Sequence, residues 1–387
     1  ARENSLCIHA QLLLPGLINA HCHLEYTHLS GQLPHGPVDF GRWIEAIIAA
    51  KRVTAPEEHE RSARDGVLQL LAGGCTTVID SVSCPSASSV VSQGPLRYFL
   101  FCEVLGLTQE SAERTFRAAE EQLATVSTKG GEPDPSRGFQ GVGINPHAPY
   151  SVGPHLRRRL CEYLTAHPEA ICSWHLGETR AEMELFQKGT GELADFLGRN
   201  KLPLPFEEIP GCDPVTFLEL EGLLDRCDMA FHLNWFPLEK GAHFAAPRAV
   251  VHCPSTHAYF AREPFPMMEL LRAGANVCLG TDSLASSDTL SMLDILRRAA
   301  REFPALTGPQ LLDLVTRNPA RSRVLSGARA PLGVIARGAA ADFTVLATPR
   351  EGAHALPLRD ILLDERTHVA MTIVAGEPVW RAMPDGN

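Results

Sequence analysis

The sequence predicts an α/β protein: a (β/α)8 barrel with a small β-sandwich domain formed mainly by the C-terminal strands. Apolar runs alternate with helical patterns, giving about eight β-α units over roughly 310 residues, the spacing of a closed parallel barrel. Polar residues stand where several of these runs end. The pattern changes after Pro331, where short strands replace it. An open doubly wound sheet is the alternative, but no Gly-x-Gly-x-x-Gly motif opens a first helix.

The elements can be followed along the chain. The apolar run Leu12–Leu14, ending at Pro15-Gly16, predicts a buried barrel strand. Two amphipathic helices come next, and the second stops at a Gly73-Gly74 pair. The full set of later elements is helices 40–50 and 57–71, strands 75–80 and 97–105, helix 110–126, strand 141–145, helix 155–166, strand 170–175, helix 180–188, strands 229–233 and 249–252, helix 266–273, strand 276–280 and helix 288–300.

The domain boundaries follow from this order. Residues 15–330 form the predicted (β/α)8 barrel. Residues 331–387 form the small β domain, with antiparallel strands in 332–346 and 369–380. Residues 1–14 are predicted to be a lead-in to that domain.

Composition narrows the class of partner. The chain has 387 residues, 44% of them hydrophobic, and a formal net charge of -10. Its basic residues are scattered, so we expect a small-molecule substrate and neither nucleic acid nor a membrane as partner. No apolar segment reaches the ~20 residues that span a bilayer, and the stretch before Pro15 is too short for a secretory leader. The eleven cysteines include no Cys-x-x-Cys pair, which predicts free thiols and a cytoplasmic protein.

The stretch around His21 and His23 is the first candidate site. Residues two apart on a strand point to the same face, so the two imidazoles project together while Cys22 points away. Paired imidazoles at a strand end suit zinc, iron, copper or nickel. The plainer interpretation is a pair of buried, hydrogen-bonded histidines.

Further polar residues follow other predicted strands, where catalytic groups of a (β/α)8 barrel lie. They are His147, His175, His232, His252 and Asp282, with Glu178 three residues beyond His175. A single one of these could be a structural polar residue. Burying all of them without partners would cost about 1–3 kcal/mol each, so convergence on a metal and a polar substrate is the better explanation.

Several motifs together resemble the amidohydrolase superfamily. They are Pro15-Gly-Leu-Ile-Asn-Ala-His-Cys-His-Leu, His175-Leu-Gly-Glu-Thr, Val251-His-Cys-Pro-Ser, Leu279-Gly-Thr-Asp-Ser-Leu-Ala-Ser and Gly338-Ala-Ala-Ala-Asp-Phe. Within it the chain is similar to the branch of cytosine, guanine, adenosine-type and S-adenosylhomocysteine deaminases and triazine chlorohydrolases. His23-Leu-Glu, Phe40-Gly-Arg-Trp-Ile and His252-Cys-Pro-Ser-Thr-His-Ala-Tyr-Phe look closest to aminodeoxyfutalosine deaminases.

The resemblance implies roles for the residues. His21, His23, His175 and Asp282 would hold one divalent metal ion, zinc first and iron as the alternative. His232 would hydrogen-bond the metal-bound water, Asp282 would accept a proton from it, and Glu178 would protonate the heterocycle. Members with two metals carry a lysine at the end of the fourth strand. Here that strand ends at Asn145, so a single metal is expected.

Four residues are predicted to contact substrate: Glu25, His147, His252 and Ser283. For Glu25 the equal alternative is capping of the next helix. Ser283 could instead be the N-cap of helix 288–300. Family members have a longer β segment before the Pro-Gly-Leu motif, so the lead-in at residues 1–14 is expected to be incomplete. Dimers are common among relatives, which makes a homodimer one expectation.

The expected activity is hydrolytic release of ammonia from an aminated heterocycle, foremost a 6-aminopurine nucleoside such as adenosine, S-adenosylhomocysteine or aminodeoxyfutalosine. One alternative keeps the site and displaces chloride or an amine from an s-triazine. Guanine or cytosine deamination is another. A barrel that binds a metabolite without catalysis is disfavoured, because loss of catalysis should leave the ligand residues replaced.

Overall fold

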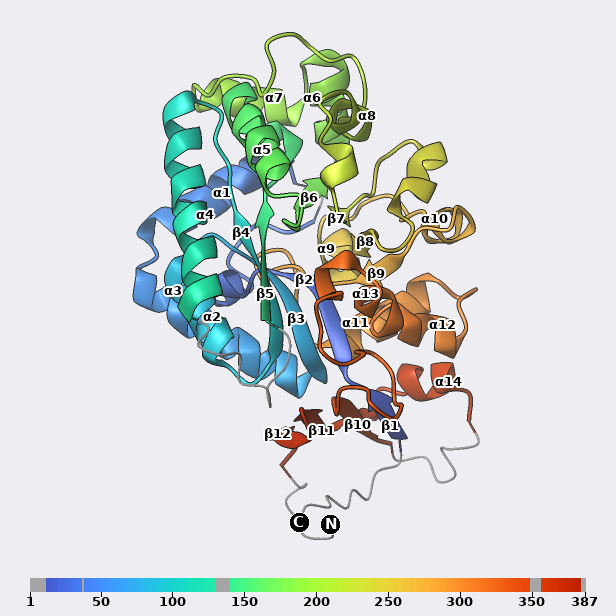
Figure 1. Ribbon diagram of the computed structural model, residues 1–387. Coiled ribbons are helices and arrows are strands. Elements are labelled where there is room, and N and C mark those ends of the chain that lie inside the picture. The colour runs from blue at the N-terminus through green and yellow to red at the C-terminus, as the bar shows by residue number, and fades with distance from the viewer. Residues whose placement is uncertain (1–11, 37, 130–139, 349–355, 384–387) are drawn as a thin grey trace.

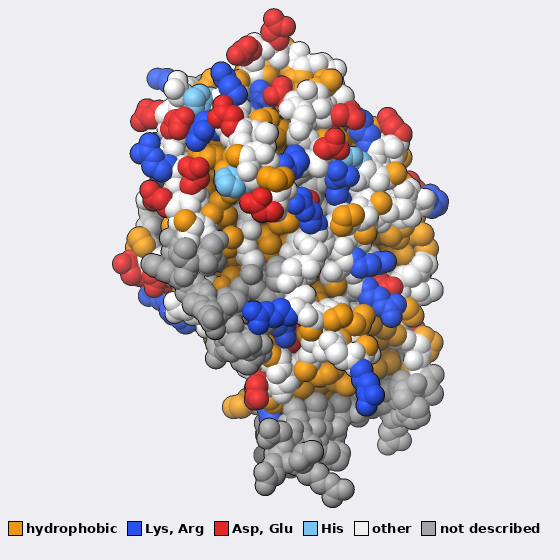
Figure 2. All heavy atoms as spheres, in the orientation of Figure 1, with side chains coloured by type: hydrophobic (Ala, Val, Ile, Leu, Met, Phe, Trp, Pro, Cys, Tyr) orange, Lys and Arg blue, Asp and Glu red, His pale blue; other side chains and the backbone are white. Residues whose placement is uncertain are grey.

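The computed structural model describes residues 12–36, 38–129, 140–348 and 356–383. Most of the predicted lead-in, residues 1–11, lies outside the described residues, as do 349–355 and 384–387 of the predicted small β domain. None of the helices within the described ranges combines the length and apolar character that crossing a bilayer requires. Acidic and basic side chains are interspersed on the face drawn in Figure 2.

Two parallel four-stranded sheets form the centre of the molecule. The first has the order β2 (Leu17–Cys22), β3 (Cys75–Val82), β4 (Arg97–Glu103), β5 (Gln140–Asn145), and the second β6 (Ser173–Leu176), β7 (Met229–His232), β8 (Ala249–His252), β9 (Val277–Leu279). Parallel bridges between Ile144 and Cys172 and between Cys22 and Asp282 connect the two sheets at both edges. The eight strands thus neighbour one another in chain order, and the α/β class with parallel sheets is confirmed (Figure 1).

Helices cover the outside of these strands (Figure 1). They are α1 (Phe40–Val53), α2 (Pro56–Ala72), α3 (Pro85–Gln93), α4 (Gln109–Lys129), α5 (Pro154–Ala166), α6 (Arg180–Lys188), α7 (Glu192–Arg199), α8 (Pro214–Leu220), α9 (Pro254–Tyr259), α10 (Met267–Arg272), α11 (Met292–Glu302), α12 (Gly308–Asp313), α13 (Arg317–Ala320) and α14 (Leu358–Leu363). Short 3-10 helices occupy Leu24–Leu29, Pro149–Ser151, Leu224–Arg226, Leu238–Phe244 and Arg323–Leu325.

Side-chain capping sets where several helices begin. The Asp39 carboxylate accepts from the Arg42 N–H at the start of α1, and the Ser291 hydroxyl accepts from the Asp294 N–H at the start of α11. Ser291 is therefore the N-cap of α11, and the alternative that gave this role to Ser283 is wrong.

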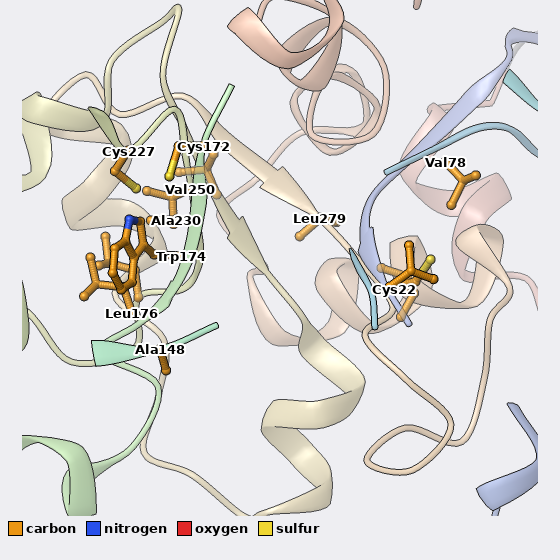
Figure 3. Close-up of a cluster of buried hydrophobic side chains, with 14 of the residues drawn as sticks. Cys22, Val78, Ala148, Cys172, Trp174, Leu176, Cys227, Ala230, Val250 and Leu279 are labelled. Carbon is orange, nitrogen blue, oxygen red and sulfur yellow. The ribbon is translucent and has the colours of Figure 1, made fainter. Parts of the chain in front are cut away.

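The strand side chains separate into two apolar clusters. Residues pointing outward pack against the helices, and Figure 3 shows part of this core, in which Trp174 lies near Leu176 and Ala230. Residues pointing inward, among them Ile18, Ile79, Phe101, Phe231 and Val251, form a separate cluster. This alternation decides which polar side chains can point to the inward face of the strands.

A small antiparallel sheet has the order β1 (Leu12–Pro15), β10 (Phe343–Ala347), β11 (His368–Val374), β12 (Glu377–Arg381). The prediction that Leu12–Leu14 is a barrel strand is wrong, because Leu12 pairs with Leu346 and Leu14 with Thr344. Pro15 ends this strand, and Gly16 separates it from β2, which continues the apolar run. Within the described residues these four strands make a single sheet.

The small sheet packs where the parallel strands begin. The Thr344 hydroxyl donates to the Gly74 carbonyl at 2.6 Å, and the Thr372 hydroxyl donates to the Leu71 carbonyl at 2.7 Å. The small sheet therefore lies at the amino ends of the parallel strands (Figure 1). The predicted site residues lie at the opposite, carboxyl ends of these strands.

Candidate active site

A change of register places the two histidines of β2. Ile18 and Ala20 point into the interior cluster, so simple alternation would turn His21 outward. The pairing of β2 with β3 shifts between Asn19 and Cys22, and this irregularity re-aims the residues after it. The His21 ring stacks on Phe231 of the interior cluster at a centroid distance of 3.8 Å. His21 and His23 thus face inward and Cys22 joins the outer core.

Three imidazoles meet at the carboxyl ends of β2 and β6. The potential ligand atoms of His21, His23 and His175 all lie within 4.8 Å of one another. The Nε2 atoms of His23 and His175 are 3.3 Å apart. Asp282 Oδ1 lies 3.6 Å from His21 Nε2 and 3.8 Å from His23 Nε2. The four residues predicted as metal ligands are therefore brought together.

The donor set fits a divalent cation. Both ring nitrogens of His21 are buried and have no hydrogen-bond partner among the described residues. Burial and neighbouring imidazoles lower the pKa of His21 and His175 well below the ordinary value, which keeps them neutral, the form that binds metal. A contact of 3.0 Å between His175 Nδ1 and the His147 carbonyl directs Nε2 of His175 to the cluster.

Asp282 is fixed by three hydrogen bonds. Its Oδ1 accepts from the Ser283 N–H at 2.8 Å. Its Oδ2 accepts from the Thr256 hydroxyl at 2.9 Å and the Ser286 hydroxyl at 3.1 Å. The backbone of Asp282 is left-handed, with φ of 56°, a strained conformation for a non-glycine residue. The carboxylate is held facing the imidazoles.

Glu178 lies across from this cluster and is paired on both sides. Arg262 Nη2 donates to Glu178 Oε1 at 2.7 Å, and His232 Nε2 is 3.9 Å from Glu178 Oε2. Burial alone would raise the pKa of Glu178, but the neighbouring His232 imidazole and Arg262 guanidinium outweigh it and lower that pKa. Glu178 is consequently a carboxylate in the free protein.

A second carboxyl group supports the loop that carries Glu178. Glu182 Oε2 accepts from the Glu178 N–H at 2.8 Å, and the Asn234 amide donates to the Glu178 carbonyl at 2.9 Å. Burial raises the pKa of Glu182 to about 8, so this side chain is mostly protonated at neutral pH.

A cavity of about 550 Å³ opens onto the imidazoles. Of the predicted residues, it is lined by His23, His147, His175, Glu178, His232, Asp282 and Ser283. His147 is fixed by a 2.7 Å contact between its Nδ1 and the Ser151 hydroxyl. Seven predicted residues thus line one cavity. His21 is buried and does not line it.

Two predicted substrate-contact residues do not line this cavity. The Glu25 carboxylate accepts from the Ser83 N–H and hydroxyl and from the Cys84 N–H at 2.8 Å, just before α3. It therefore organises the turn after β3. His252 points outward from β8, where its ring stacks on Phe265 at 3.9 Å and its Nε2 lies 3.7 Å from Glu302. Neighbouring Val251 occupies the interior face, so alternation turns His252 away.

Two functional candidates were missed from the sequence. Glu103 ends β4, lines the cavity and lies with His147 and His175 in a second group whose ligand atoms are within 4.8 Å. The rule of polar residues at strand ends would have found it, but the predicted strand ran on to residue 105. Arg262 lies in a loop after α9 and not at the end of a strand, so the same rule could not have identified it.

Known proteins similar in sequence cover most of the chain. A sequence model described as the amidohydrolase family matches residues 12–379. The 5-methylthioadenosine/S-adenosylhomocysteine deaminase of Natronomonas pharaonis is 26% identical over 398 residues, which cover 98% of this chain and 84% of that protein. The aminodeoxyfutalosine deaminase of Deinococcus radiodurans is 27% identical over 307 residues, which cover 76% of this chain and 69% of that protein.

Solved structures share the fold. An adenosine deaminase from Xanthomonas campestris with bound zinc superimposes with a TM-score of 0.74 at 24% identity, covering 97% of this chain and 82% of that one. An aminofutalosine deaminase from Helicobacter pylori, in complex with methylthio-coformycin, superimposes with a TM-score of 0.74 at 20% identity, covering 95% of this chain and 86% of that one. At these identities the likeness concerns the arrangement of the chain alone.

Proposed function

Because the chain belongs to the amidohydrolase family, we propose that it is a metal-dependent deaminase that hydrolyses the 6-amino group of a purine nucleoside and releases ammonia. The observation that carries this proposal is the meeting of three imidazoles and Asp282 at one cavity, which Glu178, the partner of Arg262, also lines. The names of the sequence relatives, which are deaminases of adenosine derivatives, support the same reaction and the nucleoside class.

His21, His23, His175 and Asp282 would hold one divalent cation, with zinc as the first choice and iron as the alternative. The chemistry that such a cation supplies is acidification of water, whose pKa falls towards ~7 in sites of this kind. Glu103 and His147 lie beside His175, but the absence of a lysine at the end of β5, whose last residue is Asn145, keeps the proposal at one metal ion.

The reaction consumes one water and must place two protons. One ends on the ring nitrogen next to the reacting carbon, and the other on the departing amine. We assign the first to Glu178, which starts as a carboxylate, takes a proton from the attacking water and gives it to the ring nitrogen. We assign the second to Asp282, whose Oδ1 faces the histidines while Oδ2 is held by Thr256 and Ser286.

His232 orients the attacking water in this scheme. Burial lowers the pKa of its imidazole, so the ring is neutral and can both donate and accept a hydrogen bond. Phe231 points inward, so simple alternation would turn the next residue, His232, outward. The backbone of His232 is left-handed, with φ of 70°, and its side chain faces Glu178 instead. Ser283 and His147 line the same cavity and are proposed to contact the base.

Glu103 is proposed to bind the sugar. Its side chain is 6% exposed and faces the cavity, and its Oε2 has no hydrogen-bond partner among the described residues. A buried carboxylate oxygen without a donor is costly, and the two hydroxyls of a ribose are a matched pair of donors. The carboxylate would thus select nucleosides over free bases.

The architecture that supports the site is proposed to be one (β/α)8 barrel. The two bridges at the sheet edges support closure of the ring, and site residues at the carboxyl ends of β6, β7 and β9 agree with the usual position of barrel active sites. The antiparallel sheet would be part of a small β-sandwich domain. The cysteines among the described residues are free, which supports a reducing cytoplasmic compartment, and a homodimer stays a proposal.

Ammonia release by the metal-loaded protein tests the proposal. The panel contains adenosine, S-adenosylhomocysteine, aminodeoxyfutalosine, guanine, cytosine and a chloro-s-triazine. Rapid release from a 6-aminopurine nucleoside, reduced by orders of magnitude in Asp282→Asn with metal retained, is the expected result. Chloride release from the triazine, or turnover of guanine or cytosine alone, would replace the proposed substrate class. Wild-type turnover in Asp282→Asn would overturn the role of Asp282.

A further inference from the structure

We propose that Asn19 is a positioning residue of the metal site. Its side-chain amide holds the segment that carries His21 against the segment that carries Asp282, and so sets how these two ligands face each other. The inference rests on the proposed function, because it concerns the same metal ion. It is carried by hydrogen bonds between residues 262 positions apart in the sequence, at the seam where β2 meets the chain that follows β9.

This seam has no regular ladder at the level of the site. β9 ends at Leu279, before the chain reaches Asp282. On the other side, β2 shifts its register against β3 between Asn19 and Cys22. A bridge between Cys22 and Asp282 is isolated and belongs to no named strand pair. Regular strand pairing therefore does not by itself fix the position of His21 relative to Asp282.

The Asn19 amide spans the seam. Its Oδ1 accepts from the Thr281 N–H at 3.2 Å and from the His21 N–H at 3.3 Å. Its Nδ2 donates to the Thr281 hydroxyl at 2.8 Å, and that hydroxyl donates to the Asp282 carbonyl at 3.1 Å. One side chain is thus bonded to the backbone of one metal ligand and, through Thr281, to the backbone of the other.

The surroundings of Asn19 fix the direction of its amide. Asn19 and Thr281 are both fully buried, so water does not compete for these bonds. A reversed amide would point its two N–H donors at the N–H groups of His21 and Thr281. Only the orientation with Oδ1 facing both backbone N–H groups satisfies all partners.

The two segments approach each other very closely at this point. A Cβ atom on Gly280 would lie 2.8 Å from the His21 carbonyl oxygen and 2.9 Å from the His21 backbone nitrogen. Asp282 adopts a left-handed backbone, with φ of 56°, which persists only where its neighbours hold it in place. Asn19 supplies part of that support through Thr281. The distance of 3.6 Å between Asp282 Oδ1 and His21 Nε2 depends on this arrangement.

Asn19 can influence the reaction only through the ligands. It is buried in β2 and lies outside the cavity lining, so it does not contact the substrate. Residues that orient metal ligands from behind typically change metal affinity by about 10- to 100-fold when they are replaced. Loss of the Asn19 amide should therefore be measured first in the binding of the cation itself.

Two variants test this. Asn19→Ala removes the amide, and Thr281→Val removes the hydroxyl to which the amide donates while it keeps the shape of the side chain. Each should weaken zinc binding by about 10- to 100-fold, measured by competition with a chelating indicator. The visible absorption bands of bound Co²⁺ should also differ from those of the wild type, because Asp282 is displaced in the coordination geometry.

Asn276→Ala is the matched control. Asn276 is 6% exposed and immediately precedes β9, at the end of that strand away from the site. Its amide donates to the Arg248 carbonyl at 3.2 Å and to the Asn318 carbonyl at 3.0 Å, so it too joins distant segments. We expect Asn276→Ala to lower the melting temperature and to keep the zinc Kd and the Co²⁺ spectrum of the wild type.

Wild-type zinc affinity and an unchanged Co²⁺ spectrum in Asn19→Ala would overturn the inference, whatever the melting temperature. An equal loss of affinity in Asn276→Ala would also overturn it, because weaker binding would then follow from lower stability alone. If Asn19→Ala does not fold, wild-type affinity in Thr281→Val would reject the inference. Zinc binding without deamination would overturn the proposed reaction alone, whereas a wild-type protein that binds neither zinc nor Co²⁺ would overturn the metal site and this inference with it.

Discussion

Arg262 and Glu178 form a buried ion pair, with Nη2 of the arginine 2.7 Å from Oε1 of the carboxylate and side chains that are 7% and 10% exposed. Glu178 follows β6 and Arg262 follows α9, so the pair joins two loops at the same end of the strands. The Arg262 guanidinium also lies 4.5 Å from the Phe260 ring centroid. Arg262 therefore both positions Glu178 and helps to keep it ionised.

Replacing Arg262 with glutamine should move the pH dependence of catalysis. Loss of the cation raises the pKa of Glu178, since Arg262 is one of the charges that lower it. The proposed reaction starts from the carboxylate, so the acidic limb of the kcat/KM profile should shift to higher pH, and activity at neutral pH should fall by about 10- to 100-fold.

Arg180→Gln is the control for this experiment. Arg180 is exposed, stacks over Trp235 and lies 3.5 Å from Glu263, outside the cavity lining. Superimposable profiles for Arg262→Gln and the wild type would contradict the positioning role of Arg262. Lower activity of Arg262→Gln with the acidic limb of its kcat/KM profile at the wild-type pH would mean that Arg262 has only a structural role.

Metal binding should stabilise the fold measurably. A bound cation would give a partner to one of the two buried, unpartnered ring nitrogens of His21. Zinc at 100 times its Kd should raise the free energy of unfolding by about 2.7 kcal/mol, and a chelator should reverse this. Thermal unfolding with and without zinc, together with metal analysis, measures both effects.

A pair of histidine variants makes this test specific. His23→Asn should abolish the zinc-dependent shift in melting temperature. His252→Asn should keep it, because His252 points away from the cluster towards Phe265. A shift of equal size in both variants would mean that zinc stabilises the protein from another site.

Glu103→Gln should weaken recognition of the sugar. The amide replaces one acceptor oxygen with a donor, so one of the two ribose hydroxyls loses its partner. The ratio of kcat/KM for adenosine over 2′,3′-dideoxyadenosine should therefore fall by about tenfold. The same ratio in both proteins would show that Glu103 serves only to orient His23, whose Nδ1 is 4.0 Å away.

The rule that polar residues end barrel strands identified His175, His232 and Asp282, but it ignored the alternation of side chains. Val251 is an interior residue, so His252 had to point outward, and this could have been deduced from the sequence. The inward turns of His21 and His232 could not, because they depend on a register shift against β3 and on a left-handed backbone. The contact between Glu178 and Arg262 spans 84 residues and has no local sequence pattern.

The helices and strands also divide into those that local sequence pattern predicts and those that depend on distant partners. The alternation of strands and helices was sufficient for the α/β class and the parallel sheets. Assignment of Leu12–Leu14 depended on which partner strand it met, and β10 lies more than 300 residues later. Short helices such as α3 and α7 were missed because they carry fewer turns of periodic pattern.

Glu182 should make stability fall with rising pH. Its pKa is about 8 in the folded protein and 4.5 ordinarily, so between these values the folded state holds a proton that the unfolded chain releases. The free energy of unfolding then decreases by up to about 1.4 kcal/mol per pH unit over that range. Glu182→Gln keeps an acceptor for the Glu178 N–H without needing the proton.

The advantage of Glu182→Gln over the wild type should therefore grow from about pH 4.5 to pH 8 and stay constant above. Melting temperatures across this range measure it. Glu184→Gln, on the same helix but half-buried, is the control. A difference that does not change with pH would show that Glu182 is ionised in the folded protein.

The buried pair between Arg97 and Asp342 should hold the small sheet to the parallel strands. Arg97 begins β4, Asp342 immediately precedes β10, and Arg97 Nη2 donates to Asp342 Oδ1 at 2.9 Å with both side chains at most 7% exposed. Asp342→Ala leaves a buried guanidinium without this partner, which should lower the free energy of unfolding by about 3–5 kcal/mol. Arg97→Met/Asp342→Leu should recover part of that loss, because it removes both buried charges together.

Chemical denaturation of these variants separates the pair from surface charge effects. Breaking the exposed pair of Arg301 and Glu365, whose side chains are 53% and 82% exposed, with Arg301→Gln should cost at most about 1 kcal/mol. Because the small sheet packs at the amino ends of the strands, kcat/KM of folded Asp342→Ala should match the wild type below its unfolding transition. A double variant no more stable than Asp342→Ala would mean that packing around Arg97, and not its charge, links the two parts of the chain.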